Sequence, residues 1–285
     1  MLWGNFVSKE ALAAVGASSP IINMLIGFFM GLATGAGVII AQYFGAGDNG
    51  RLKKAVHSSA ALTLVMSLLL TVIGIIGTNP MLHAIGIPAD VFHDSSTYLM
   101  IYFAGISFNL IYNMGSGILR AMGDSKRPLY FLIIACIVNI ILDFLFVKYL
   151  HMGVAGGAGY ATLIAQAISA ILVVIVLIRS EGPHQLFWKQ IRFHFPILKK
   201  IIMVGGLPTG IQQSIVSLSN VIVQSYVNAF GSSVVAGYSA TIRIDGFVNL
   251  PLQSFNMAVT TFVGGKILVL SNMNASKKVR VLHCG

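Results

Sequence analysis

The apolar stretch 133–147 carries an amide and a carboxylate four residues apart, Asn139 and Asp143. On a helix, positions i and i+4 lie one above the other on the same face. The carboxylate of Asp143 can give oxygens to a hard cation or take up a proton, and Asn139 adds a neutral carbonyl oxygen beside it. The pair therefore predicts a cation or proton site within an apolar helix.

Two interpretations of Asp143 remain open from its position alone. A charged group at the bilayer centre costs about 2.5–3.5 kcal/mol on insertion scales, so acidic groups there usually face a cavity or a partner. Alternatively, the carboxylate reaches out to the surface, because Lys148 marks the outer end of the stretch about 7 Å further along. Acidic side chains are shorter than those of Lys and Arg, which favours the interior site.

A third candidate ligand is Thr162, in the sequence Gly156-Gly-Ala-Gly-Tyr-Ala-Thr-Leu-Ile-Ala-Gln166. The small residues before it would let this helix pack closely on a neighbour, so that the hydroxyl could join the other oxygens. The alternative is that the hydroxyl bonds back to a carbonyl four residues earlier in its own helix.

Polar residues also gather in two later apolar stretches, where a lipid-exposed helix would not tolerate them. We expect these helices to face a wet cavity that takes the substrate. The candidate cavity residues are Gln212, Gln213, Asn220, Gln224, Arg243 and Asp245. The last two are two positions apart and do not face each other on a regular helix, so we do not expect them to pair.

Two glycine-containing segments separate apolar stretches. The segment Gly45-Ala-Gly-Asp-Asn-Gly50 fits G-x-G-x-x-G, but it follows an apolar helix rather than a strand. We interpret it as a helix C-terminus and turn, not as a dinucleotide site. Arg120, Gly123 and Asp124 lie in a second polar turn, which favours a structural hinge or latch over a contact with substrate.

The composition places these residues in a membrane. Of 285 residues, 56% are hydrophobic and only 9% are charged, whereas a soluble domain carries about 25% charged residues. A crossing helix needs about 20 apolar residues. The stretches of that length are 20–43, 57–77, 97–118, 129–147, 154–178, 200–226 and 235–263. The expected fold is all-α, a multi-pass membrane protein of about seven helices, and glycines spaced by four in the first of them (27, 31, 35) predict close packing.

Basic residues lie in alternate loops, which places those loops in the cytoplasm. They follow the first, third, fifth and seventh stretches, so the N-terminus is expected outside and the C-terminus inside. The net charge of +10 reflects this pattern and not a nucleic-acid-binding face. Cys136, Cys284 and the scattered histidines show no disulfide or metal spacing. Without a catalytic Ser/His/Asp or Cys/His set, we expect neither an enzyme nor a cofactor.

A shift of 223 residues aligns the chain with part of itself, for example Asn5 with Asn228 and Lys54 with Lys277. In both copies a short polar outer loop leads into an Ala/Gly-rich helix that ends in a basic segment. Internal repeats of this kind are common in transporters. The repeat predicts two bundles of six helices, of which this chain would hold helices two to eight and lack both ends.

Four segments together resemble the MATE transporters (multidrug and toxic compound extrusion), most closely the bacterial branch related to the DNA-damage-inducible type. These segments are 10–16, 33–48, 119–128 and 139–143. The resemblance extends from Asn5 to about Val263. It implies twelve helices in two six-helix lobes, and export of cationic, amphipathic drugs in exchange for Na⁺ or H⁺.

The resemblance also implies a cation site in the first lobe. The family's Asn-x-x-x-Asp pair on the fifth helix is matched by Asn139 and Asp143, and its threonine on the sixth helix by Thr162. A further aspartate comes from the family's first helix, which we expect to be missing here. The implied parts, in order, are an incomplete N-terminal lobe (helices 2–6), a cytoplasmic linker and the start of the C-terminal lobe (helices 7–8): 1–178, 179–199 and 200–285.

The tail departs from the family pattern. Where the family continues Phe-Val-Gly with Gln-Asn-Ile-Gly-Ala, residues 266–270 read Lys-Ile-Leu-Val-Leu. Suitable codons read one base late convert the first sequence into the second, so we expect a local frame slip followed by an early stop.

The sequence thus predicts a piece of a cation-coupled (Na⁺ or H⁺) antiporter in the bacterial plasma membrane that exports amphipathic cationic drugs by alternating access. Small cationic molecules and the lipid bilayer are the expected partners, without nucleic acid, and the full-length protein is expected to be a monomer. A flippase for lipid-linked saccharides of the same superfamily and a non-functional fragment of the exporter remain as alternatives. A seven-helix receptor fits the span count but not the Asn-x-x-x-Asp pair.

Overall fold

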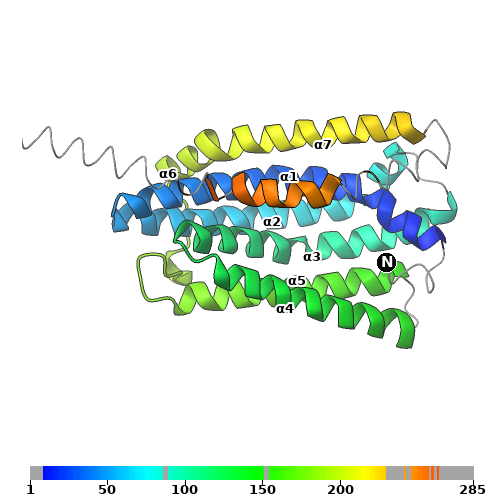
Figure 1. Cartoon of the computed structure of the whole chain (residues 1–285), viewed down its shortest axis with the longest axis horizontal. Coiled ribbons are helices and arrows are strands. Elements are labelled where there is room, and N and C mark those ends of the chain that lie inside the picture. The colour runs from blue at the N-terminus through cyan, green and yellow to red at the C-terminus, as the bar shows by residue number, and fades with distance from the viewer. Residues whose placement is uncertain are drawn as a thin grey trace, which may run out of the picture.

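The chain folds into an elongated bundle of long helices (Figure 1). The computed structural model describes residues 9–85, 89–150, 154–228 and 245–256, with positions 241, 258, 259 and 262. The helices are α1 (Lys9–Gly45), α2 (Asn49–Ile85), α3 (Ala89–Ala121), α4 (Lys126–Phe144), α5 (Val154–Arg179), α6 (Phe195–Lys200) and α7 (Leu207–Asn228). A π-helical turn extends α4 (Leu145–Tyr149), another joins α6 to α7 (Ile201–Gly206), and a 3-10 turn covers Trp188–Gln190. The described residues contain no strand, so the predicted all-α fold is confirmed.

Most of these helices are long and apolar enough to cross a bilayer. The spans found in the described part of the chain are Ile26–Gly45, Asn49–His83, Lys126–Tyr149, Gly156–Arg179 and Phe195–Asn220. They overlap the first, second, fourth, fifth and sixth stretches expected from the sequence. The seventh, 235–263, is described only in part, and the third is helical as α3 but is not among the spans. The chain is a multi-pass membrane protein.

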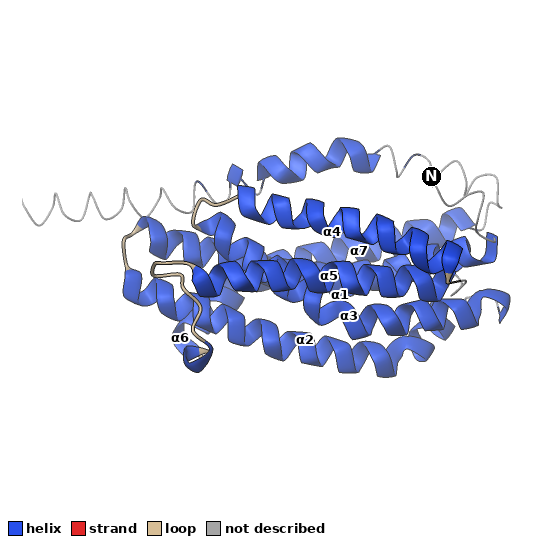
Figure 2. Cartoon of the chain, turned by 90° about the horizontal axis from the view of Figure 1, so that it is seen from below, coloured by secondary structure: helices blue, strands red, loops and turns tan. Residues whose placement is uncertain are grey.

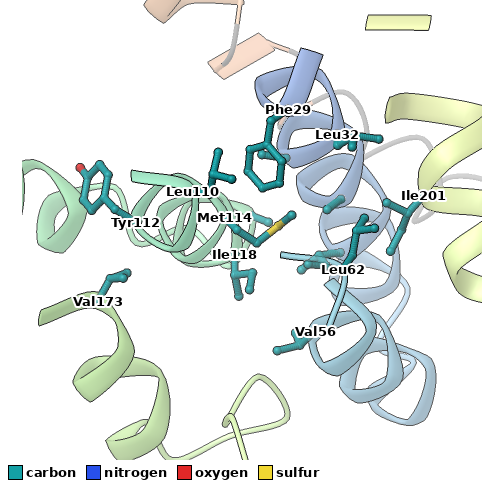
Figure 3. Packing of buried hydrophobic residues seen from close by; sticks show 14 of the residues in the cluster. Phe29, Leu32, Val56, Leu62, Leu110, Tyr112, Met114, Ile118, Val173 and Ile201 are labelled. Carbon is teal, nitrogen blue, oxygen red and sulfur yellow. The ribbon is translucent and has the colours of Figure 1, made fainter. Parts of the chain in front are cut away.

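The polar character of α3 follows from its place inside the bundle, where it contacts α1, α2 and α5. Phe103 is fully buried, and Leu110 and Met114 lie near Phe29 of α1 in the apolar core (Figure 3). A helix that is covered by protein on several sides does not need an apolar surface for lipid. Buried hydroxyl groups on α3 are compatible with a membrane position where the bundle supplies a partner, as for Ser96, which donates to Asn79 Oδ1 of α2 at 2.8 Å.

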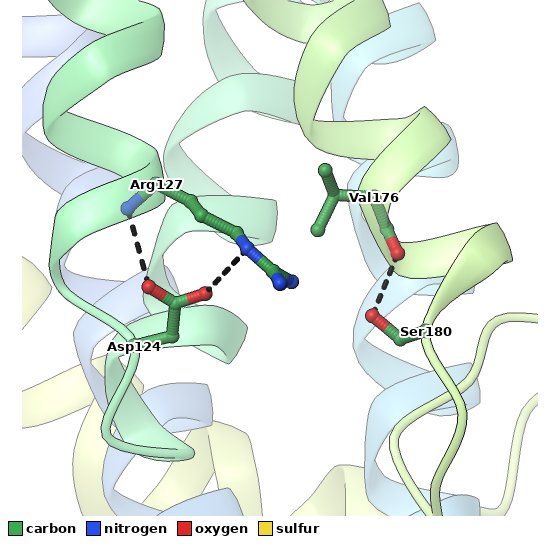
Figure 4. Close-up of polar contacts among 4 residues, drawn as sticks. All are labelled: Asp124, Arg127, Val176 and Ser180. Atoms are coloured by element: carbon green, nitrogen blue, oxygen red, sulfur yellow. Dashed lines mark hydrogen bonds and ion pairs between the residues drawn. The ribbon is translucent and has the colours of Figure 1, made fainter.

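The turn between α3 and α4 combines a glycine C-cap with an aspartate. Gly123 has a φ of +88°, a conformation that glycine adopts without steric cost. Its N–H donates to the carbonyl of Arg120, and the N–H of Asp124 donates to the carbonyl of Leu119, both at 2.9 Å. The Asp124 carboxylate then accepts the backbone N–H of Arg127 (3.1 Å) and lies 3.3 Å from its Nε, as Figure 4 shows. These contacts end one helix and begin the next.

The turn between α1 and α2 repeats this construction at the same end of the bundle (Figure 1). Gly47 has a φ of +69°. The carboxylate of Asp48 accepts the backbone N–H of Arg51 (2.9 Å) and lies 3.5 Å from its Nε. The G-x-G-x-x-G segment is thus a helix end and turn, as the sequence predicted.

α1 and α7 approach each other backbone to backbone. A Cβ atom added to Gly31 would lie 2.5 Å from the Cα of Gly210 and against the nitrogen of the same residue. A Cβ on Gly210 would in turn lie 3.1 Å from the carbonyl oxygen of Phe28. Glycine on both helices is what permits this approach, so the close packing predicted from the spacing of Gly27 and Gly31 is present.

The linker between α5 and α6, residues 180–194, is fastened to the side of α2 (Figure 2). The N–H of Phe187 donates to His57 Nε2 at 3.1 Å, while His57 Nδ1 lies 2.7 Å from the carbonyl oxygen of Lys53. A second backbone N–H of the linker donates to the hydroxyl of Ser58. Because Nδ1 must donate to the carbonyl and Nε2 must accept, this arrangement requires the neutral form of His57.

Candidate cation site

α4 lies at the edge of the bundle beside α5, and only a narrow face of it packs against the rest of the protein (Figure 1). Ala135 on this face is buried, and Asn139 and Asp143, which follow it at intervals of one turn, are both partly buried. The large apolar residues on the other sides are about half exposed: Ile137 53%, Ile140 54% and Ile141 59%. The Asn-Asp pair is therefore turned toward α5 and not toward lipid.

The facing helix brings Thr162 to the pair. Asn139 Nδ2 donates to Thr162 Oγ1 across a long contact of 3.5 Å, which leaves the amide oxygen of Asn139 as an acceptor. One turn before Thr162, a Cβ atom on Gly159 would lie 3.1 Å from Ile101 of α3. The small residues at the start of α5 thus allow the tight helix packing that holds Thr162 in place.

Asp143 is the group in this cluster whose hydrogen bonding is incomplete. Its Oδ1 atom is buried and has no hydrogen-bond partner among the described residues. Removing a charged oxygen from water without a partner is strongly unfavourable. A proton on the carboxyl group, or a small cation bound to it, would remove this cost.

The donor set fits a hard monovalent cation or a proton and not a transition metal. Asp143, Asn139 and Thr162 offer a carboxylate, an amide carbonyl and a hydroxyl, all of them oxygen donors of the kind that hard cations prefer. No group of three or more His, Cys, Asp or Glu side chains is found together in the part of the chain that the structure describes.

α3 supplies polar groups that the sequence reasoning did not select. Tyr98 lies close enough to Asp143 for the two side chains to interact electrostatically. One turn further on, Tyr102 lines a small pocket between α3 and α5, together with Asn109, Thr162 and other residues of both helices. The signal that could have pointed to them is the i, i+4 spacing of Tyr98 and Tyr102 on a helix with polar residues along its length.

Those of the expected substrate-cavity residues whose side chains the structure describes line neither the small pocket between α3 and α5 nor an apolar groove between α2 and α5. Gln212, Gln213 and Asn220 are exposed on α7, and Asp245 is also exposed. The Cβ atom of Gln213 faces α1 at Gly27. Two others, Gln224 and Arg243, have side chains outside the described residues. Their role in substrate binding stays a prediction, as does the division of the chain at 178 and 199.

Comparison with known proteins agrees with this arrangement. The family model described as MatE matches residues 1–145 and 208–267. The chain is 32% identical over 277 residues to the probable multidrug resistance protein YoeA of Bacillus subtilis strain 168, with 94% of this chain and 59% of the relative covered. The probable multidrug resistance protein YpnP of the same organism is 31% identical over 272 residues, with 93% and 59% covered.

Solved structures give the same result. The outward-facing conformation of a multidrug resistance MATE family transporter of the MOP superfamily superposes with a TM-score of 0.86 at 25% identity, covering 94% of this chain and 59% of that one. The chain thus spans a little under three fifths of the length of the proteins it matches. On its family match, its relatives and its fold, the chain belongs to the MATE family of multidrug and toxic compound extrusion transporters.

Proposed function

We propose that the chain is part of an antiporter that exports amphipathic, cationic drugs across the bacterial plasma membrane, driven by Na⁺ or H⁺. The observation that carries this proposal is the buried, unpartnered oxygen of Asp143 beside Asn139 and Thr162. The relatives whose names state multidrug resistance support the drug substrate. The same names support a transporter and not an enzyme.

The coupling follows from the charge of Asp143. With neither proton nor cation, the carboxylate carries an uncompensated charge beside α5, which penalises close packing of α4 on α5. Binding of a cation or a proton removes that penalty and lets the helices pack. A cation and a drug that favour different states of the transporter then exchange across the membrane, because each shifts the equilibrium against the other.

The test uses a chimera, because the chain spans 59% of the Bacillus subtilis relative. This chain replaces the matching part of that relative, and ethidium efflux is measured in cells that lack their own pumps, at several Na⁺ concentrations and pH values. Asp143→Asn should abolish the Na⁺- or pH-driven efflux. Asp94→Asn, which removes a charge from α3 at the same end of the bundle, is the matched control and should leave efflux intact.

Each outcome of this assay bears on the proposal. Undiminished export by the Asp143→Asn chimera would refute the role of this carboxylate. Export that responds to neither Na⁺ nor pH would refute cation coupling. Efflux by the 285-residue chain on its own would show that it transports without the remaining length of its relatives.

A further inference from the structure

An apolar groove lies on the side of the bundle, near the linker. Its walls come from α2 and α5, represented by Leu64 and Val174, and α3 contributes Met114 and its neighbours. The linker closes one end of the groove with Trp188 and Ile191. The groove is therefore formed by α2, α3, α5 and the linker together, and it is separate from the candidate cation site.

The groove opens toward lipid. Leu64 at its edge is 43% exposed, and the same face of α2 continues with the exposed residues Leu68, Leu69, Val72, Ile73 and Ile76. The hydroxyl group in the lining, that of Thr63, donates to the carbonyl of Ser59 at 2.8 Å and is satisfied there. An apolar, lipid-facing slot with its hydroxyl already bonded suits a hydrocarbon chain.

The end of the groove carries an aromatic side chain and positive charge. Trp188 is 61% exposed, and Lys189 follows it in the same 3-10 turn. Lys53 Nζ lies 4.8 Å above the ring of Phe187, the residue that precedes Trp188. Tryptophan and basic side chains are enriched where a membrane protein meets the headgroups, and the basic ones favour anionic lipids.

Acidic residues of the linker do not offset the positive charge of its basic residues. Between positions 179 and 200 the sequence contains five basic residues and a single acidic one, Glu181. The ion pairs of the described residues, Arg51 with Asp48 and Arg127 with Asp124, do not involve Lys189. The ammonium group of Lys189, next to the groove residue Trp188, is therefore available to a phosphate at the mouth of the groove.

We propose that this groove binds an anionic phospholipid of the cytoplasmic leaflet. One acyl chain lies along the groove between α2 and α5, and the phosphate is held by Lys189 beside the indole of Trp188. The lipid would then contact both the helices of the groove and the linker, and would fasten the linker to the bundle in addition to the hydrogen bonds that the linker donates to His57 and Ser58. Lipid binding in this groove does not require that the chain transports a substrate.

Trp188 is itself the reporter, because the sequence has only one other tryptophan, Trp3. The Trp3→Phe chain is reconstituted in vesicles that contain a fixed fraction of phospholipid with brominated acyl chains, either phosphatidylglycerol or phosphatidylcholine. Bromine quenches indole fluorescence at contact. We expect brominated phosphatidylglycerol to quench Trp188 more strongly than brominated phosphatidylcholine at equal mole fraction.

Charge and groove variants identify the cause of the preference. A basic residue near an anionic surface contributes about 1 kcal/mol, about fivefold in affinity, so Lys189→Gln should reduce the preference for phosphatidylglycerol by about that factor. Ala60→Leu, which fills the groove without changing charge, should reduce quenching by both lipids. Lys126→Gln, at the start of α4 away from the groove, is the control and should keep the full preference.

Two results would overturn the proposal. Equal quenching of Trp188 by the two lipids in the Trp3→Phe chain would show that no anionic lipid is selected. An equal loss of preference in Lys189→Gln and Lys126→Gln would show a general effect of charge in place of a site. Far-ultraviolet circular dichroism of each variant in the same vesicles checks that the helices are retained.

Discussion

The contact between α1 and α7 makes a quantitative prediction at Gly31. A methyl group there would lie 2.5 Å from Gly210 Cα and 2.8 Å from the carbonyl carbon of Thr209. Carbon atoms in contact prefer about 3.5–4.0 Å, so Gly31→Ala must push the helices apart by about 1 Å. All of the opposing atoms belong to the backbone, and therefore no side-chain rotation can relieve the overlap.

The size of the effect comes from two opposing contributions. Overpacking costs about 1–3 kcal/mol, and we take the upper end because backbone meets backbone. Alanine is preferred over glycine inside a helix by about 1 kcal/mol. The net loss of unfolding free energy is about 2 kcal/mol, which at about 2–4 °C per kcal/mol lowers the melting temperature by about 4–8 °C.

Gly27→Ala is the matched control on the same face of α1. Its Cβ atom would lie 3.5 Å from Gln213 Cβ, an ordinary van der Waals distance. It should therefore keep or raise the melting temperature. The assay is thermal unfolding in detergent, followed by circular dichroism. If Gly31→Ala melts at or above the temperature of Gly27→Ala, the close approach of the two helices is refuted.

Three further predictions concern the turns and the linker. Gly123→Ala should lower the free energy of unfolding by about 1–2 kcal/mol, because alanine disfavours a φ of +88°; Gly156→Ala, in a helix with open space around it, should not destabilise in the same melting assay. His57→Phe removes the acceptor for the Phe187 N–H, so limited proteolysis should cut the linker faster than in the unchanged chain, and an unchanged rate would count against this attachment. Burial lowers the pKa of His184 below its ordinary value of 6.5. Folding therefore favours the neutral form of the His184 ring. The stability that this ring contributes is present above about pH 6.5 and is lost as the pH falls through the pKa of His184 in the folded protein. His184→Asn should therefore weaken the drop in melting temperature on acidification, and an identical drop in both proteins would contradict this.

The arrangement along single helices could be predicted from the sequence. Helical periodicity alone places Asn139 and Asp143 on one face, and the glycine at 123 followed by aspartate indicates a turn by residue type. The close contact of α1 with a neighbour follows from the spacing of small residues at 27 and 31. These are local patterns, and each depends on a few positions in one segment.

The neighbours of each helix could not be predicted in this way. Hydropathy measures how apolar a segment is, but it does not distinguish a helix covered by protein from one covered by lipid. α3 is a helix covered by protein: its polar residues Tyr98, Tyr102 and Asn109 lie inside the bundle near the candidate cation site. The attachment of the linker at His57 joins residues 130 positions apart, and no local pattern reports such a distance.

The central claim is that Asp143 exchanges a proton or a Na⁺ ion inside the first bundle. Infrared difference spectroscopy of the chain in lipid, between low and high pH and with or without Na⁺, observes carboxyl protonation directly. We predict that a protonated-carboxyl band disappears at high pH or on addition of Na⁺, and that the band is absent from Asp143→Asn but present in Asp94→Asn. A band that persists unchanged in Asp143→Asn would contradict the claim.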